Sequence, residues 1–230
     1  MLQNSLAALV GRSAVSDVTL TGNCERVAGA DDETGTFTYK ALGTGGSRYD
    51  FSYPSGPLTE IRPPLSAEIA GAWSGPDNSS GPIAAHNLLG DVSIFPVFAI
   101  GRLNSTQTFV VTFVGQETKN GLTLYHLSTY QQFPQQSGVA AALNQHLTQT
   151  DIFLDPATWL PVAVDFYTHP DDNALVDISV EIVFSNYHQV NGVQVPFHVQ
   201  KYLNNSLSLD LQIQLVVLNS GISATTFQAQ

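Results

Sequence analysis

Histidines are the residues of this chain with the broadest chemical capability, and their spacing argues against a local site. No two of the six lie within four residues of each other, so a metal centre would need histidines brought together from distant segments. The sequence gives no sign of such convergence, and we predict neither a metal site nor a cofactor. The six positions are His86, His126, His146, His169, His188 and His198.

Catalytic motifs are also missing. The sequence has no Gly-x-Ser-x-Gly nucleophile elbow, no phosphate-binding loop and no His-Glu-x-x-His motif. His86, Asp91 and Ser93 come nearest to a hydrolytic group, although an apolar loop explains this segment without chemistry. We therefore predict no catalytic residues and a protein that is not an enzyme. A hydrolase built from these three residues is one alternative, which a structure placing them beyond hydrogen-bonding reach would exclude.

Composition narrows the class of partner. Only 12% of the 230 residues are charged, and the net charge is −11. Beyond residue 103 the basic residues are Lys119 and Lys201, which argues against nucleic acid, because binding phosphates needs Lys and Arg. No run approaches the roughly 20 apolar residues of a membrane-spanning helix. The longest candidate, 92–101, is interrupted by Ser93 and Pro96.

A single domain accounts for the whole length. With 43% hydrophobic residues, a domain spanning 1–230 can bury a full core. Cys24 is the only cysteine, which rules out an internal disulfide and a zinc-thiolate cluster and leaves its role open. Met1 begins directly on amphipathic sequence, without a basic and then apolar leader, so we expect that any export signal has been removed.

The C-terminal third predicts a long antiparallel meander. Apolar and polar residues alternate from 176 to 184 and again from 193 to 199, on either side of Asn191-Gly192, which is a strong hairpin turn signal. A third alternating run covers 207–217. A two-residue Asn204-Asn205 turn would put the polar face of this run on the core, so we predict a three-residue loop, 203–205, that sets Val199 against Leu209.

The remaining elements are shorter. Strands are predicted at 36–41, 48–53, 58–62, 67–73 and 161–168, with a hairpin of 106–118 and 122–133 through Asn120-Gly121. Helices are predicted near the start, at 84–89 and within 137–149, and an apolar loop is predicted at 94–98. These elements indicate a mainly β protein with few helices. They favour a large curved antiparallel sheet with the short helices and the loop on its concave face.

Two segments have a functional and a plain interpretation. Asn186 and His188 break the inward apolar face of the meander, either because the strand has reached the rim or because they form the polar end of an apolar cavity. The stretch 120–150 carries no charge. It is either an exposed amide-rich hairpin and helix, or a surface that contacts a partner or covers the cavity, where charges would be costly to desolvate.

Several motifs resemble the LolA-like superfamily. The family's aromatic-rich early strands are similar to Arg48-Tyr49-Asp50-Phe51-Ser52-Tyr53-Pro54 of this chain, followed by 58–62 and the Ala72-Trp73 step. The family's strand, acidic turn and Leu-Pro step match 151–161, and its aromatic, turn-glycine and Pro-Phe strand pair matches 184–197. The family includes periplasmic lipoprotein carriers, lipid-binding lipoproteins and envelope-stress sensors, and this chain is most similar to exported bacterial members.

The resemblance implies an unclosed β-barrel whose hydrophobic concavity holds acyl chains, in the periplasm or cell envelope of a Gram-negative-type bacterium. The carrier's lid-locking arginine lies between two aromatic residues, a slot that is Asp50 here, with Arg48 two positions earlier. We therefore predict a generic apolar ligand, a lipid or a lipoprotein acyl chain; the alternative is an envelope module that binds or senses another protein. The predicted ligand-binding residues are Phe95, Phe98, Val180, Ile182, Phe184, Asn186, His188, Val195, Phe197, Leu209 and Leu211.

Overall fold

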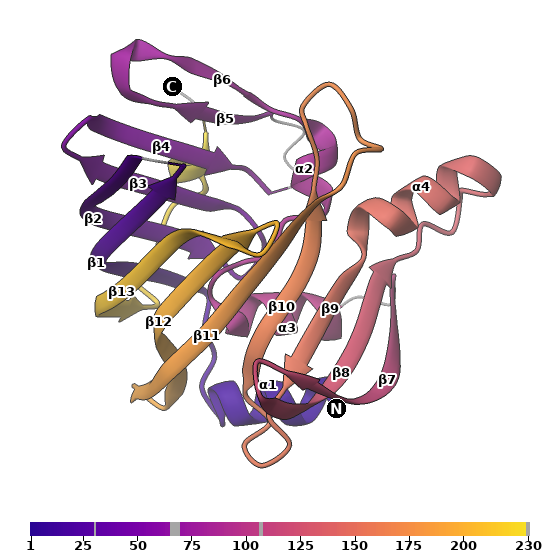
Figure 1. Cartoon of the computed structure of the whole chain (residues 1–230). Coiled ribbons are helices and arrows are strands. Elements are labelled where there is room, and N and C mark those ends of the chain that lie inside the picture. Colours follow the sequence, from indigo (N-terminus) through magenta and orange to yellow (C-terminus); the bar gives the residue numbers. More distant parts are fainter. Residues whose placement is uncertain (30, 65–69, 106–107, 229–230) are drawn as a thin grey trace.

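The computed structural model describes residues 1–29, 31–64, 70–105 and 108–228. Its strands form a single antiparallel sheet in the order β6-β5-β4-β3-β2-β1-β13-β12-β11-β10-β9-β8-β7. Figure 1 shows this sheet curving into a half-barrel that does not close, which confirms the predicted fold class. The strands are β1 Asp17–Ala28, β2 Asp31–Leu42, β3 Ser47–Tyr53, β4 Gly56–Arg62, β5 Gly71–Ser74, β6 Ser80–Ile83, β7 Phe109–Lys119, β8 Leu122–Gln131, β9 Thr150–Leu154, β10 Pro161–Thr168, β11 Ile178–Val190, β12 Val193–Leu203 and β13 Ser206–Leu218.

The strand order divides the chain into two sequential meanders. One runs from β1 to β6 and the other from β7 to β13, and within each meander every strand pairs with its neighbours in sequence. The two meanders join through the single pairing of β1 with β13. The outer strands β6 and β7 are therefore the two free edges of the described sheet.

Two hairpin turns form where the sequence predicts them. Asn120-Gly121 connects β7 to β8, and Asn191-Gly192 connects β11 to β12. All four residues have positive φ, between 50° and 87°, as a type I′ turn requires. The predicted pairing of Phe184 with Val199 is confirmed.

The predicted three-residue loop between β12 and β13 is wrong. Leu203 pairs with Ser206, so the turn has the two residues Asn204 and Asn205, both with positive φ. A β-bulge at Ser208 then shifts the register, and Val199 faces Leu211 instead of Leu209. The bulge returns the apolar face to the core, which the prediction had achieved with a longer loop.

A second bulge changes the face of β13 again. Thr21 pairs with Leu215 and Gly22 with Ile213, which leaves Gln214 without a counterpart. A Cβ atom on Gly22 would lie 2.0 Å from the Gln212 carbonyl oxygen, so this close approach requires glycine. Of the alternating run 207–217, only Leu209, Leu211 and Ile213 lie on the core face; Leu215 and Val217 are exposed, and Val216 and Leu218 pack inward instead.

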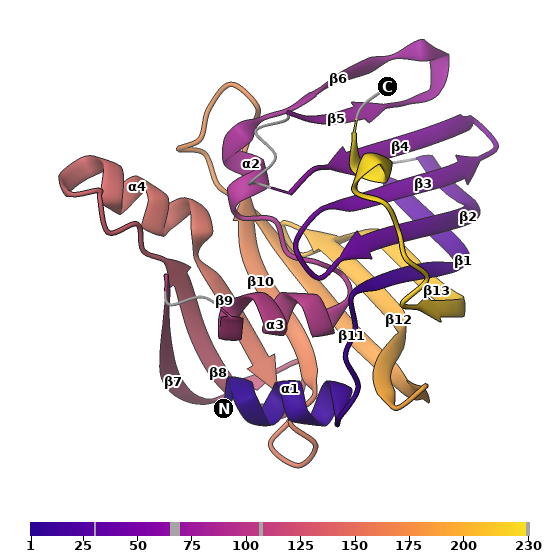
Figure 2. The same ribbon diagram turned by 180° about the vertical axis from the view of Figure 1, so that it is seen from behind.

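Four α-helices accompany the sheet in the described part of the chain, and Figure 2 shows α1 and α3 lying across its concave face. They are α1 Leu2–Val10, α2 Ala85–Leu89, α3 Pro96–Ser105 and α4 Gly138–Thr148. Three are predicted correctly, but the predicted apolar loop 94–98 is wrong because α3 begins at Pro96. Proline has no N–H to satisfy and favours the first helical turn. Among the described residues, no helix is long and apolar enough to cross a membrane.

Candidate functional site

The concave face has two sides that differ in packing. On the filled side, α1 packs against α3 and β12, and Leu9, Phe95, Ile100, Phe184 and Val195 are buried there within one hydrophobic cluster. On the cavity side, a space of ≈600 Å³ separates the sheet from α2 and α3. The cavity is therefore bounded by strands from both meanders and by the two helices of the segment that connects them.

Apolar side chains supply most of the cavity wall. Strands β2, β9 and β10 contribute apolar residues to it, and helices α2 and α3 contribute others from the opposite wall. A volume near 600 Å³ is in the range of small-molecule sites, about 300–1,000 Å³. These apolar residues include Ala41, Leu88, Leu89, Phe98, Leu103, Ile152 and Val164.

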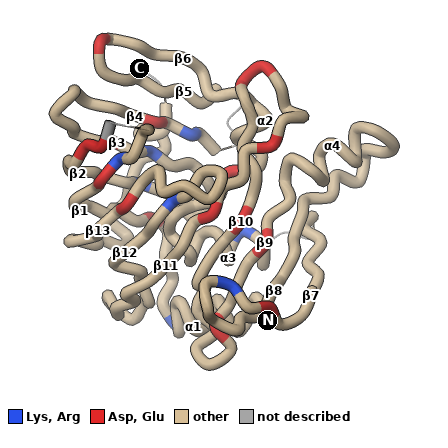
Figure 3. The backbone as a smooth tube through the Cα atoms, in the orientation of Figure 1, with Lys and Arg blue, Asp and Glu red and all other residues tan. Residues whose placement is uncertain are grey.

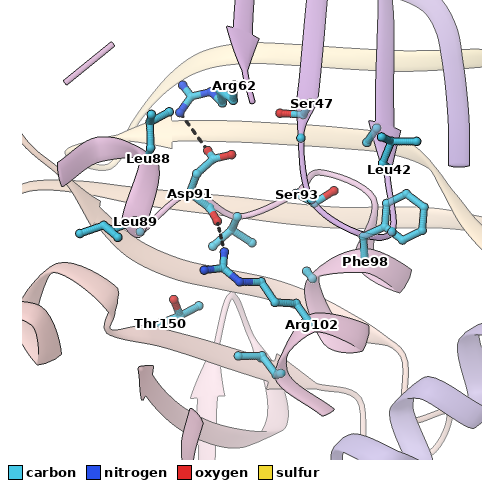
Figure 4. Close-up of a pocket in the computed structure, with 18 of the residues that line it drawn as sticks. Leu42, Ser47, Arg62, Leu88, Leu89, Asp91, Ser93, Phe98, Arg102 and Thr150 are labelled. Atoms are coloured by element: carbon cyan, nitrogen blue, oxygen red, sulfur yellow. Dashed lines mark hydrogen bonds and ion pairs between the residues drawn. The ribbon is translucent and has the colours of Figure 1, made fainter. Parts of the chain in front are cut away.

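One end of the cavity carries charged groups, drawn in Figure 4. Arg62 Nη1 on β4 lies 3.1 Å from Asp91 Oδ1 in the loop between α2 and α3, and Arg62 Nη2 lies 3.1 Å from Glu60 Oε2. Arg102 on α3 donates to the Asp91 carbonyl oxygen at 3.4 Å. This polar group thus ties β4 to the segment that covers the sheet.

Burial sets the direction of two pKa shifts at the cavity wall. It raises the pKa of Asp91 above its ordinary value, although the positive charge of Arg62 partly opposes the shift. Burial also raises the pKa of Tyr39, whose hydroxyl lies 2.8 Å from Ser93 Oγ at the cavity wall. Both shifts indicate a poorly solvated site, where ionic contacts are stronger than in water.

A smaller space of ≈50 Å³ adjoins the cavity and shares Arg62 and Asp91 with it. Lys201 on β12 lines this space, and burial lowers the pKa of its ammonium group despite the nearby carboxylates of Glu60 and Asp91. The interior therefore holds cations from β4, α3 and β12 close to two carboxylates.

The predicted ligand-binding residues separate into several groups. Phe98 lines the main cavity, and Ile182, Leu209 and Leu211 line the smaller space beside it. Phe95, Phe184 and Val195 are buried in the filled side, where Phe197 packs against the same cluster. Val180 is buried in that cluster and also borders a third pocket of ≈150 Å³.

Asn186 and His188 lie outside the cavity. Both are exposed, and His188 Nε2 lies 2.9 Å from Asn186 Oδ1, with its ring edge-on to Phe197. Asn186 has φ 54° and is skipped in the pairing with β12, whose register continues unchanged from Ser185 to Tyr187. This places the pair at a solvated strand end, and the polar end of the cavity comes from other residues.

The hydrolytic group considered as an alternative is not assembled. His86 Nε2 contacts the Pro170 carbonyl oxygen at 3.1 Å, Asp91 pairs with Arg62, and Ser93 contacts Tyr39. No hydrogen bond joins any two of His86, Asp91 and Ser93. The hydrolase alternative loses its geometric basis, because a general base must reach the group it deprotonates.

The sequence interpretation missed Arg62, and it considered Asp91 only for a hydrolytic group. Arg48, considered for a lid-locking role, forms a bidentate ion pair with Asp50 on the strand face opposite Tyr49. Arg62, in the next strand, instead points inward to Asp91. A signal was present: Glu60 and Arg62 share one strand face with Leu58, so charges occupy an otherwise apolar face.

Solved structures with the same architecture span nearly the whole chain. A domain assigned as an outer membrane lipoprotein-sorting protein from Vibrio parahaemolyticus matches with 14% identity and a TM-score of 0.57, over 99% of this chain and 97% of that one. The LolA superfamily protein NE2245 from Nitrosomonas europaea matches with 11% identity and a TM-score of 0.57, over 99% and 96%. The chain has the LolA-like fold.

A third structure with this LolA-like fold is a DUF1329 family protein from Desulfovibrio piger, with 12% identity and a TM-score of 0.62 over 99% of this chain and 95% of that one. No protein-family model matches the sequence, and no curated protein matches it. The likeness therefore lies in the fold, with little sequence identity. It confirms the predicted LolA-like resemblance at that level.

Proposed function

We propose that this protein binds an apolar ligand, a lipid or the acyl chain of a lipoprotein, in the cavity of its LolA-like half-barrel, and catalyses no reaction. The observation that carries the proposal is the ≈600 Å³ cavity, lined mainly by apolar side chains, between the concave sheet and α2 and α3. The fold supports it, since one structural neighbour is assigned as an outer membrane lipoprotein-sorting protein. The expected location is accordingly the periplasm or the cell envelope.

The charged end of the cavity suits a ligand with an anionic or ester headgroup. Arg62 has a buried Nε atom with no hydrogen-bond partner among the described residues, while its two terminal nitrogens contact Asp91 and Glu60. A guanidinium donates readily to carboxylate or phosphate oxygens. The apolar chain would occupy the space beside Phe98, Ile152 and Val164, with the headgroup near Arg62.

Native mass spectrometry of protein purified without detergent, followed by titration with a fluorescent fatty-acid probe, tests this proposal. Ala99 lines the cavity from α3, and Ala99→Trp should fill part of the space and weaken probe binding about tenfold or more. Ala142→Trp, on an exposed position of α4, is the matched control and should bind as the wild type does. Protein that carries no lipid and takes up no probe contradicts the proposal, as does equal binding by wild type and Ala99→Trp.

A second function, binding another envelope protein, is favoured by one surface. Strand β7 is a free edge of the sheet, and Phe113, Val114 and Leu122 at this hairpin are 47%, 56% and 51% exposed. Figure 3 shows that α4 and most of the neighbouring β7 and β8 carry no charged residues. An exposed apolar edge strand can pair with an extended segment of another chain. A pull-down from envelope extract that Phe113→Lys abolishes, and that the cavity variant Ala99→Trp leaves intact, would favour this function.

A further inference from the structure

Three histidines that are far apart in sequence converge beside the cavity, where α2, α4 and the end of β10 meet. The ring centroids of His86 and His146 lie 5.8 Å and 5.5 Å from that of His169. Asp177, just before β11, joins them: His146 Nε2 is 2.9 Å and His169 Nδ1 is 3.5 Å from Asp177 Oδ1. The convergence that the sequence did not indicate therefore exists in the fold.

The spacing of these groups fits a metal ion. One ligand atom from each of His146, His169 and Asp177 lies within 4.8 Å of the other two. A tetrahedral ion with ligands about 2.0–2.1 Å away separates those ligand atoms by about 3.3 Å. His146 Nε2 and Asp177 Oδ1 are 2.9 Å apart, so a small side-chain movement lets these two atoms share one ion.

The hydrogen bonding of His169 points to a missing partner. Its Nδ1 atom lies 3.1 Å from the Val176 carbonyl oxygen, which can only accept, so Nδ1 carries the proton. Nε2 then presents a lone pair, and this atom is buried with no hydrogen-bond partner among the described residues. Donation to a backbone carbonyl through one ring nitrogen, with the other free to coordinate, is the usual state of a metal-bound histidine.

The surrounding contacts hold His169 in place. The side chain of Asn87 in α2 donates to the His169 carbonyl oxygen at 2.8 Å and accepts from the His169 N–H at 2.9 Å. Gly90, at the end of α2, allows close approach to α4, because a Cβ atom there would lie 2.5 Å from the Leu147 carbonyl oxygen. His169 is thus rigidly placed, while the side chains of His146 and Asp177 are 36% and 40% exposed and give an ion access from solvent.

We propose that His146, His169 and Asp177 bind a divalent transition-metal ion, with Zn²⁺ as the best match to two imidazoles and one carboxylate. Imidazole ligands select such ions over Mg²⁺ and Ca²⁺, which prefer oxygen. The bound ion ties α4 to the loop between β10 and β11. Leu89 and Thr148, at the adjoining ends of α2 and α4, line the cavity. The ion therefore stabilises one wall of the proposed ligand site.

Calorimetric titration of the full chain with ZnCl₂, and with CoCl₂ followed by visible absorption, tests the site. We expect one ion per chain, with His146→Ala and Asp177→Ala each weakening binding at least tenfold. Both positions are partly exposed, so these variants should fold. His126→Ala is the matched control, because His126 contacts Glu117 and Asp151 through opposite ring nitrogens and so does not chelate with them; its binding should equal that of the wild type.

Thermal unfolding gives an independent readout. Zn²⁺ at a hundredfold excess over its dissociation constant should raise the Tm of the wild type by about 5 to 10 °C. The same addition should leave Asp177→Ala unchanged, while MgCl₂ should shift neither protein. Absence of saturable Zn²⁺ binding overturns the proposal, as does binding that both variants retain or that only His126→Ala loses. Each outcome is independent of lipid binding, which is measured without metal.

Discussion

The filled side and the cavity side of the concave face are built on the same sheet but end in different interiors. On the filled side, α1 and α3 bring aliphatic and aromatic side chains such as Leu9 and Phe95 into full contact with the strands. On the cavity side, the ion pair of Arg62 with Asp91 joins β4 to the loop between α2 and α3, and a space of ≈600 Å³ remains between these helices and the sheet. The difference indicates that one side stabilises the fold while the other is free to accept a ligand.

The largest effect on stability is expected when one aromatic ring is removed from each side. Phe95 is fully buried in the filled side, so Phe95→Ala should lower the free energy of unfolding by about 3–5 kcal/mol through lost burial and a new cavity. Phe98 lines the existing cavity, and Phe98→Ala should cost clearly less, because part of its surface already faces empty space. Chemical denaturation of both variants measures this; equal losses would mean that the two sides do not differ in packing.

A smaller effect is expected from the ion pair on the cavity side. Arg62→Met should lower the free energy of unfolding by about 1–3 kcal/mol, because it leaves Asp91 poorly solvated and without its main partner. The double variant Arg62→Met with Asp91→Leu should recover part of that loss, because the Asp91 carboxylate is gone while Glu60 stays without Arg62. Urea unfolding of the single and double variants provides the measurement. A double variant no more stable than Arg62→Met would show that the Asp91 carboxylate is not the cause.

Two carboxylates, Asp17 and Asp91, should differ in the sign of their pH dependence. Four hydrogen bonds from Ser16, Ser220 and Gly221 hold the pKa of Asp17 below its ordinary value of 3.8, although burial alone would raise it. Its contribution to stability is complete above 3.8 and is lost as the pH falls through the folded-state pKa.

Asp91 follows the opposite course, because burial raises its folded-state pKa above 3.8. The stability that the wild type gains from Asp91, relative to Asp91→Asn, is present below pH 3.8. It is lost as the pH rises through the raised pKa of the folded state. Urea unfolding of the wild type, Asp17→Asn and Asp91→Asn between about pH 2 and 7 gives both curves. Differences that change with pH in the same direction for both residues would contradict this assignment.

The smallest effect is expected at the strand end outside both sides. His188 is exposed and contacts Asn186, so His188→Ala should change the free energy of unfolding by less than about 0.5 kcal/mol. Binding of the fluorescent fatty-acid probe should also stay unchanged. A marked loss of probe binding in His188→Ala would show that the ligand's polar contact is His188 at the strand end and not Arg62.

Much of the sheet could be predicted because local signals agree with tertiary structure. The Asn-Gly turns set the register of two hairpins, and the alternation of 178–190 gives the correct face up to Phe184. Beyond these elements, β-bulges decide which residues face the core, and a bulge has weak sequence signals. The bulges at Ser208 and Gln214 reverse the expected face of β13 twice, which a period of two alone does not reveal.

The candidate site was less predictable because it depends on contacts between distant segments. Phe98, Ile182, Leu209 and Leu211 could be selected as apolar residues of the concave face, and they do line the two interior spaces. Arg62 meets Asp91 only because the segment after β6 folds back across the sheet. The histidine cluster likewise needs α2, α4 and the end of β10 to meet, and no sequence spacing encodes that meeting.

The single pairing of β1 with β13 also has a consequence for the order of folding. Every other strand pair in the described sheet joins neighbours in sequence, whereas this pair brings together residues such as Val18 and Leu218 from opposite ends of the chain. Closing a loop of this length has an entropic cost that must be offset by favourable contacts elsewhere. We therefore expect each meander to form its hairpins first, and the concave interior to come into existence only when the two meanders dock along β1 and β13.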